Sequence, residues 1–223
     1  MRALTPEILD FLSPDDPGAM RSRRDLARIN AVMRQGAIMA KALANYPAPK
    51  LLTDLGGGDG RFLLGLAGRL AKRWPGVRAV ILDRQDIVSD ETRERFAALG
   101  WDCEVLRGDI FETLPQIGPD IVLANLFLHH LDDAALTRLL ALVAAQSKAF
   151  VACEPRRSAL ALLGARLVFV LGANHVSRHD AVASVQAGFR GRELSALWPK
   201  DERWRLNERG VFPFTHLFQS HAV

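Results

Sequence analysis

The hydrophobic pattern of this chain changes period repeatedly between residues 50 and 155. Short apolar runs predict buried strands, and they begin near residues 51, 77, 103, 120 and 150. The longer segments between them have helical patterns, with Ser89 and Asp132 placed as helix N-caps. Strands that alternate with helices predict an α/β fold with a parallel sheet and right-handed crossovers.

The pattern differs after the fifth predicted strand. Residues 156–199 have helical patterns without an intervening strand, while 203–209 and 214–222 predict two strands that pair as a terminal hairpin. We therefore expect a helical insert at 156–199 within a domain that spans 50–223.

The first 49 residues predict a helical N-terminal cap. An apolar stripe over 24–45 predicts a helix, and Thr5 is placed as the N-cap of a shorter one, with Glu7 near its positive end. Ligands of open α/β sheets bind at the carboxyl ends of the strands. We expect the cap and the insert to lie above that edge and to form a lid and an acceptor pocket.

The segment after the first strand contains a cluster of glycines. Asp54 ends the strand, and the glycines that follow are Gly56, Gly57, Gly58 and Gly60. Such a cluster predicts a close approach of backbone to a ligand, and the free N–H groups of the helix that begins at Arg61 suit an anionic group. A dinucleotide fingerprint needs its third glycine where Arg61 stands, and a Walker phosphate loop needs a Lys-Ser or Lys-Thr that is absent here.

The remaining pattern is Asp-x-Gly-x-Gly-x-Gly, formed by Asp54, Gly56, Gly58 and Gly60. It resembles the first motif of the class I S-adenosylmethionine-dependent methyltransferases, and three later segments resemble the family in the same order, over roughly residues 51–155. The resemblance implies a Rossmann-like, doubly wound sheet of seven strands in the order 3-2-1-4-5-7-6, the last antiparallel. The alternative is an ordinary α/β domain with glycines at a tight turn.

The same resemblance implies S-adenosylmethionine as the cofactor and a set of residues that bind it. Besides the glycine motif, the set includes Asp83 for the ribose hydroxyls, its neighbour Arg84, Asp109 for the adenine amino group, and Ile110 against the ring. Asn125 is expected to line the cleft through its backbone. Because Leu-Phe-Leu follows Asn125 in place of Pro-Pro-Tyr or Pro-Pro-Phe, the segment argues against methylation of nucleic-acid bases.

Two histidines follow the fourth strand, beside the expected position of the methyl group. A phenol has a pKa near 10, so its methylation gains from a positioned base. His129 matches the histidine that serves as base in small-molecule O-methyltransferases, and related enzymes can use the second of such a pair, here His130. Glu154, at the end of the fifth strand, is placed to accept from the other ring nitrogen. Alternatively, His130 helps Asp132 to complete a helix N-terminus, and Glu154 binds a backbone amide.

Two segments of the insert allow other roles. His175 and His179 have a spacing used by zinc sites, but no glutamate follows the first, so local hydrogen bonds or substrate contacts are favoured and no metal is expected. The stretch from Leu160 to Ala173 is almost wholly apolar, but it is shorter than the ~20 residues of a membrane span and contains Arg166. A buried helix or a pocket wall is favoured, and an interfacial helix is the alternative.

Composition adds little to this picture. Lys and Arg exceed Asp and Glu by only 29 − 25 = 4, too few for a nucleic-acid surface. Cys103 and Cys153 fall within predicted strands, which indicates core positions in a reducing compartment. With no signal peptide evident at the start, we expect a cytoplasmic protein without a membrane-spanning segment. The sequence leaves open whether the protein forms a homodimer.

These observations favour a methyltransferase for a small aromatic or polyketide-like acceptor, with O-methylation assisted by histidine. The alternatives are C- or N-methylation of a quinone or amine, and a methyltransferase-like protein that binds a partner without catalysis.

Overall fold

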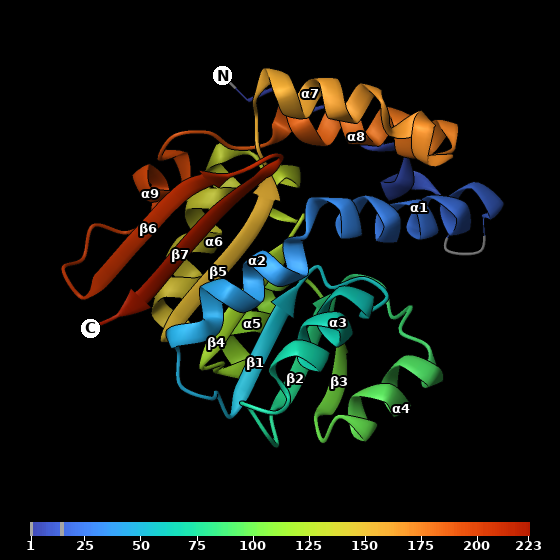
Figure 1. Cartoon of the computed structure of the whole chain (residues 1–223). Helices are drawn as coiled ribbons and strands as arrows, with labels where there is room; N and C mark the ends of the chain where they lie inside the picture. The colour runs from blue at the N-terminus through green and yellow to red at the C-terminus, as the bar shows by residue number, and fades with distance from the viewer. Residues whose placement is uncertain (1, 14–15) are drawn as a thin grey trace.

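The computed structural model describes residues 2–13 and 16–223 and contains the predicted seven-stranded sheet (Figure 1). The strand order is β3-β2-β1-β4-β5-β7-β6, as predicted, and β7 runs antiparallel to its neighbours β5 and β6. The strands are β1 Leu51–Leu55, β2 Arg78–Asp83, β3 Asp102–Arg107, β4 Ile121–Asn125, β5 Ala149–Pro155, β6 Trp204–Val211 and β7 Thr215–Ala222.

Helices cover both faces of the sheet, which is why its central strands are apolar without alternation. One face packs against α2 Gln35–Ala42, α3 Arg61–Leu70 and α4 Asp90–Ala98, and the other against α5 Ile110–Ile117, α6 Asp133–Gln146 and α9 Glu193–Leu197. The N-caps predicted at Ser89 and Asp132 are confirmed, because Ser89 accepts from the N–H of Thr92 and Asp132 from that of Ala135.

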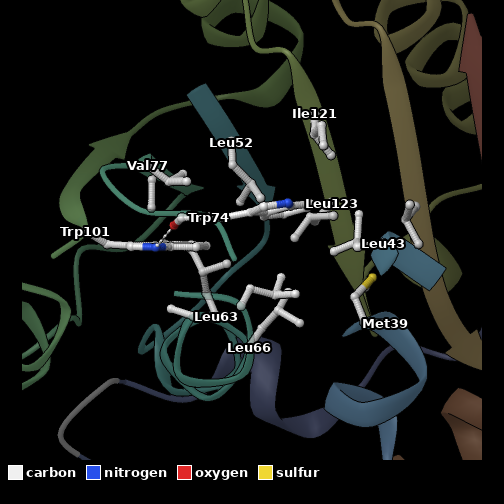
Figure 2. Packing of buried hydrophobic residues seen from close by; sticks show 14 of the residues in the cluster. Met39, Leu43, Leu52, Leu63, Leu66, Trp74, Val77, Trp101, Ile121 and Leu123 are labelled. Carbon is white, nitrogen blue, oxygen red and sulfur yellow. Dashed lines mark hydrogen bonds between the residues drawn. The ribbon is translucent and has the colours of Figure 1, made fainter. Parts of the chain in front are cut away.

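Successive residues of each central strand pack into two different hydrophobic clusters, one on each face of the sheet. In β4, Ile121 and Leu123 pack in the cluster under α2 and α3, while Val122 and Ala124 pack in the cluster with α5 and α6. Figure 2 shows the first cluster, in which the indole Nε1 of Trp101 donates to the backbone carbonyl of Trp74 over 2.8 Å. The sheet is thus held rigid from both sides up to the edge where its parallel strands end.

The N-terminal part differs from the expectation in two respects. Thr5 does not cap a helix: a short 3-10 helix, η1, spans Ile8–Phe11, and Glu7 is its N-cap without a capping hydrogen bond. The single helix expected over 24–45 is two, α1 Pro17–Met33 and α2, because Arg34 adopts a left-handed conformation with φ of 55°.

The break at Arg34 sends the two helices to different places. Figure 1 shows α1 above the carboxyl ends of the strands, as predicted, whereas α2 and the following η2 Leu43–Asn45 lie on the sheet. Met39 of α2 and Leu43 pack in the same core cluster as Leu52 of β1. The domain boundary at residue 49 remains a prediction, and the structure shows that the last helix before it helps to cover the sheet.

Residues 156–199 contain helices and no strand, as predicted, apart from an isolated bridge between Arg156 and Phe189. In Figure 1, α7 Ala159–Arg166 and α8 His175–Ala187 lie above the strand ends beside α1, with η4 Val168–Leu171 between them in sequence. In contrast, α9 packs on the sheet face, against α6 and β6. Of the α-helices of the insert, α7 and α8 therefore lie above the strand ends, and α9 does not.

Residues 160–173 were expected to form a buried helix or a pocket wall, and they are only partly buried: Ala161 and Ala165 are buried, and Leu162 lines a cavity. Leu160 is 46% exposed and Leu163 54%, so α7 presents leucines to solvent. Within the described residues, each helix is too short or too polar to pass through a bilayer. Both cysteines are free, and Cys103 is only half-buried because β3 is an edge strand.

Candidate active site

The turn after β1 has a backbone conformation that requires glycine. Gly56, Gly58 and Gly60 have φ values of 65°, 55° and 74°, which are strained for residues with a Cβ. Gly56 donates its N–H to the carbonyl of Leu82 over 2.8 Å, and a Cβ at Gly56 would lie 2.3 Å from Cδ2 of Phe127. A Cβ at Gly58, by contrast, would have nothing within 4 Å. One side of the turn is therefore packed against the segment after β4, and the backbone at Gly58 is open to a ligand.

Asp83 lies beside this turn because β1 and β2 pair in register, with Leu55 opposite Leu82. Its Oδ2 accepts from the N–H of Gly58 and its Oδ1 from that of Gln85, each over 2.9 Å. The backbone therefore fixes the orientation of the carboxylate. The side chain of its neighbour Arg84 is 84% exposed and forms a long ion pair, 3.7 Å, with Asp109.

Asp54 is buried beneath the turn, with 1% of its surface exposed. Within the described part of the chain, neither of its carboxylate oxygens has a hydrogen-bond partner. Burial raises the pKa of Asp54 to about 8, and the nearby charge of Asp83 contributes to this rise. A buried acid without a partner is costly, so its place under the glycine turn fits a ligand that brings a cationic or hydrogen-bonding group.

The other residues predicted to bind the cofactor lie at the same edge. Asp109 is the N-cap of α5, where its Oδ1 accepts from the N–H of Phe111 over 2.8 Å, and Ile110 is buried in the core under the sheet. Asn125 ends β4, and its buried Oδ1 has no partner among the described residues. The acids, the glycine turn and this amide oxygen fit a nucleoside that carries an amino-acid tail, as S-adenosylmethionine does.

The segment after β4 turns sharply toward Glu154 of β5. Leu126 has a left-handed φ of 54°, which is uncommon for a residue other than glycine. The turn leads into a short 3-10 helix, η3 Leu128–His130. Glu154 is fully buried, and its Oε1 accepts from the N–H groups of Phe127 and Leu128 over 3.0 and 2.9 Å. Glu154 therefore binds backbone amides and holds this turn, which was the alternative role considered for it in the sequence analysis.

Glu154 also holds the ring of His129. Nδ1 of His129 lies 2.7 Å from Oε2 of Glu154, so the contact expected between these two residues is present. Only 3% of His129 is exposed. The carboxylate orients the ring so that its other nitrogen, Nε2, is the one that can act on a ligand. Whether His129 and Glu154 act in catalysis stays a prediction.

No pattern in the sequence indicated that Glu7 belongs to this site. Its Oε1 lies 3.3 Å from Nε2 of His129 and also accepts from the hydroxyl of Ser184 in α8. Burial lowers the pKa of His129, but the hydrogen bonds to Glu154 and Glu7 outweigh it and raise that pKa to about 9. The pKa of Glu7 is lowered despite its burial, because His129 donates to it.

The N-terminal segment is tied to the site at several points. Asp180 of α8 accepts from the backbone N–H groups of Ile8 and Leu9, over 2.8 and 3.1 Å. Arg2 donates to the carbonyls of His129 and Leu131, over 3.3 and 2.9 Å. Glu7 is thus held against His129 by the fold on both sides.

The other histidines considered in the sequence analysis lie in two different settings. The ring of His130 lies 4.3 Å from that of His129, centroid to centroid, and is exposed. His179 pairs with the adjacent Asp180 over 3.0 Å, which is the local contact favoured for the His175 and His179 pair. A cavity of about 380 Å³ is lined by Ala3 of the N-terminal segment and by residues of the insert such as Leu162 and Gln186, and none of the predicted site residues lines it.

A family model described as an O-methyltransferase domain matches residues 15–150. The chain belongs to this family. The predicted resemblance to class I methyltransferases is therefore confirmed at the level of the family. The matched residues include the glycine turn, Asp83, Asp109 and both histidines of η3.

Relatives of this O-methyltransferase family member match over parts of their length. A mitomycin biosynthesis 6-O-methyltransferase from Streptomyces lavendulae is 34% identical over 109 residues, which cover 48% of this chain and 30% of the relative. An uncharacterized methyltransferase from Mycobacterium tuberculosis is 42% identical over 93 residues, covering 40% of this chain and 43% of the relative. The chain therefore spans less than half of these curated relatives.

Solved structures support the fold of this O-methyltransferase family member. The mitomycin 7-O-methyltransferase MmcR has a TM-score of 0.63 at 22% identity, and the match covers 94% of this chain and 59% of the MmcR chain. The plantazolicin methyltransferase BpumL, in complex with SAH, has a TM-score of 0.67 at 13% identity, and the match covers 94% of this chain and 92% of the BpumL chain. At these identities, the likeness concerns the fold.

Proposed function

We propose that this protein is an S-adenosylmethionine-dependent methyltransferase that acts on a hydroxyl of a small acceptor. The observation that carries the proposal is the contact between the glycine turn after β1 and the segment after β4 that contains His129. Phe127 packs on Gly56 of the glycine turn, and His129, held by Glu154, follows two residues later. A candidate base therefore adjoins a turn built to hold a ligand.

The cofactor supplies a methyl group that is already activated on a sulfonium sulfur. Asp83, oriented by the N–H groups of Gly58 and Gln85, is suited to the ribose hydroxyls, and Asp54 offers its unpartnered carboxyl beneath the turn. Asp109 and Ile110 are assigned to the adenine. Membership of the O-methyltransferase domain family and the SAH bound to BpumL support this assignment.

His129 is assigned as the base. Nδ1–H of His129 donates to Glu154, so Nε2 can take the proton of the acceptor hydroxyl as the oxygen bonds to the methyl carbon and the bond from that carbon to the sulfonium sulfur breaks. Glu154 then stabilises the imidazolium. In the structure the carboxylate of Glu7 is paired with Nε2 and stabilises the protonated form of His129. The acceptor hydroxyl therefore has to displace Glu7 before His129 can act as a base.

The acceptor is proposed to be an aromatic or polyketide-like compound. The names of two relatives, the mitomycin biosynthesis 6-O-methyltransferase and a strychnine O-methyltransferase from Strychnos nux-vomica, support a small acceptor. So do the apolar residues of α7 near the strand ends. A cytoplasmic location, the absence of a nucleic-acid partner and a homodimer remain predictions.

The position of Glu7 also favours a second candidate, C- or N-methylation of a quinone or amine. Such an acceptor needs less help from a base, and a His129 that stays paired with Glu7 is compatible with it. A labelled-methyl assay distinguishes the two when phenols, quinones and amines are tested with wild type and His129→Ala. O-methylation that depends on His129 supports the proposal, and near-full turnover of a phenol by His129→Ala contradicts it. The third possibility, a binding protein without catalysis, predicts no saturable heat when S-adenosylmethionine is titrated.

A further inference from the structure

A cluster of metal-ligating side chains lies where the N-terminal segment meets η3. One ligand atom from each of Glu7, His129 and His130 lies within 4.8 Å of those of the other two. The cluster includes a buried imidazole, which distinguishes it from the exposed acidic groups that occur on many surfaces. We propose that Glu7, His129 and His130 form a binding site for a divalent transition-metal ion, with Zn²⁺ as its simplest occupant.

The distances suit a first-row ion. Two nitrogen or oxygen ligands at about 2.0–2.1 Å from a tetrahedral Zn²⁺ lie roughly 3.3 Å from each other. Nε2 of His129 and Oε1 of Glu7 are 3.3 Å apart. The ligand atom of His130 lies within 4.8 Å of both of them, and because His130 is exposed it leaves the site an opening to solvent.

The orientation of the His129 ring suits this role. Its Nδ1 lies 2.7 Å from the buried carboxylate of Glu154, so Nε2 is the nitrogen that faces Glu7, and a metal ion bound there would take the place of the proton on Nε2. A ligating histidine that donates its other ring N–H to a carboxylate is a common arrangement around protein-bound metals. Glu7 is held in the same way, because Ser184 donates to it.

Charge also favours a cation at this position. Two carboxylates, from Glu7 and Glu154, flank the single imidazole of His129. A carboxylate oxygen accepts but does not donate, so Oε1 of Glu7 is attracted to Nε2 of His129 through a proton on that nitrogen, and a metal ion would replace this proton between the same two atoms. A divalent ion would balance both carboxylates.

This inference goes beyond the proposed function and does not depend on methyl transfer. The donor set is two imidazoles and a carboxylate, which suits Zn²⁺ and its neighbours rather than Mg²⁺ or Ca²⁺. The ion and the acceptor hydroxyl would use the same atom, Nε2 of His129. A bound ion would therefore withdraw His129 from its role as a base.

The test is a binding measurement on the full chain without an affinity tag, after treatment with a chelator. ZnCl₂ is titrated by calorimetry, and Co²⁺ is titrated by visible absorption. We expect saturable binding of one ion per chain. Glu7→Gln and His130→Ala should each weaken it at least about tenfold, because each removes a ligand.

The controls are matched to these changes. Glu112→Gln removes an exposed glutamate and His221→Ala an exposed histidine, both in other elements, and neither should change the affinity. No saturable binding to the wild type overturns the proposal. So does binding that Glu7→Gln and His130→Ala leave unchanged, because the ion would then lie elsewhere. Methyl transfer is not the readout, so an inactive protein that binds Zn²⁺ contradicts the proposed function alone.

Discussion

The two halves of the candidate site are built in different ways. The cofactor half consists of residues at the ends of β1, β2 and β3, each placed by its own strand and the turn that follows. The acceptor half brings together Glu7, His129, Glu154 and Ser184, which come from four separate elements. The first half depends on backbone conformation, and the second on side chains that meet only when the N-terminal segment and α8 pack on η3.

This difference implies that the halves can be disturbed separately. A change in the acceptor half should alter turnover and leave cofactor binding intact. A change in the glycine turn should alter stability and cofactor affinity together, because the same backbone groups serve both.

The largest expected effect is that of His129→Ala on turnover. Loss of a general base lowers kcat by about 10²- to 10⁴-fold, whereas the dissociation constant for S-adenosylmethionine should stay within about twofold because His129 is not part of the turn. Steady-state assays with a phenol and calorimetric titration of the cofactor measure the two quantities. An equal loss of both would show that the halves are not separable.

The next effect separates two glycines of the same turn. Both Gly56→Ala and Gly58→Ala introduce the strain of a left-handed residue, about 1–2 kcal/mol. Only Gly56→Ala also drives a Cβ into the ring of Phe127, which adds about 1–3 kcal/mol. Urea denaturation should show the larger loss for Gly56→Ala, and equal losses would mean that Phe127 gives way freely.

A smaller effect is expected for the acids of the cofactor half. Asp83→Ala removes the carboxylate assigned to the ribose hydroxyls, together with its hydrogen bonds to Gly58 of the turn and to Gln85, and should weaken the binding of S-adenosylmethionine by about 10- to 100-fold. Asp109→Ala should weaken it less, since one oxygen of Asp109 serves as a helix cap. The KM for the acceptor should not change in either variant. Equal effects on cofactor and acceptor would contradict the assignment of Asp83.

The smallest effect, when it is expressed per pH unit, concerns the pH dependence of stability. The pKa of Asp54 is about 8 in the folded state, against 3.8 for an unperturbed aspartate, so between these values the folded protein holds one more proton than the unfolded chain. Stability should therefore fall as pH rises through this window, by at most about 1.4 kcal/mol per pH unit. Asp54→Asn should flatten the curve, as measured by urea denaturation from pH 4 to pH 8. An unchanged curve would show that Asp54 is ionised and has a partner.

The residue pattern was sufficient for the sheet and for much of the cofactor half. Apolar runs and caps such as Ser89 predicted strands and helices because burial on both faces and capping act over a few residues. Strand order came from the family resemblance, and the structure confirms it. Asp54, Asp83 and the glycines could be placed because parallel strands in register bring their ends to one edge.

What the sequence determined by itself is therefore local: where strands end, which turn needs glycine, and which acid follows each strand. Only the tertiary structure decided that Arg34 divides the N-terminal helix, that α2 covers the sheet, and that Glu7 meets His129. Glu7 and His129 lie 122 positions apart, and no spacing rule links them. Their contact depends on how η1 docks against Asp180 of α8, which is a result of packing between elements and not of any single segment.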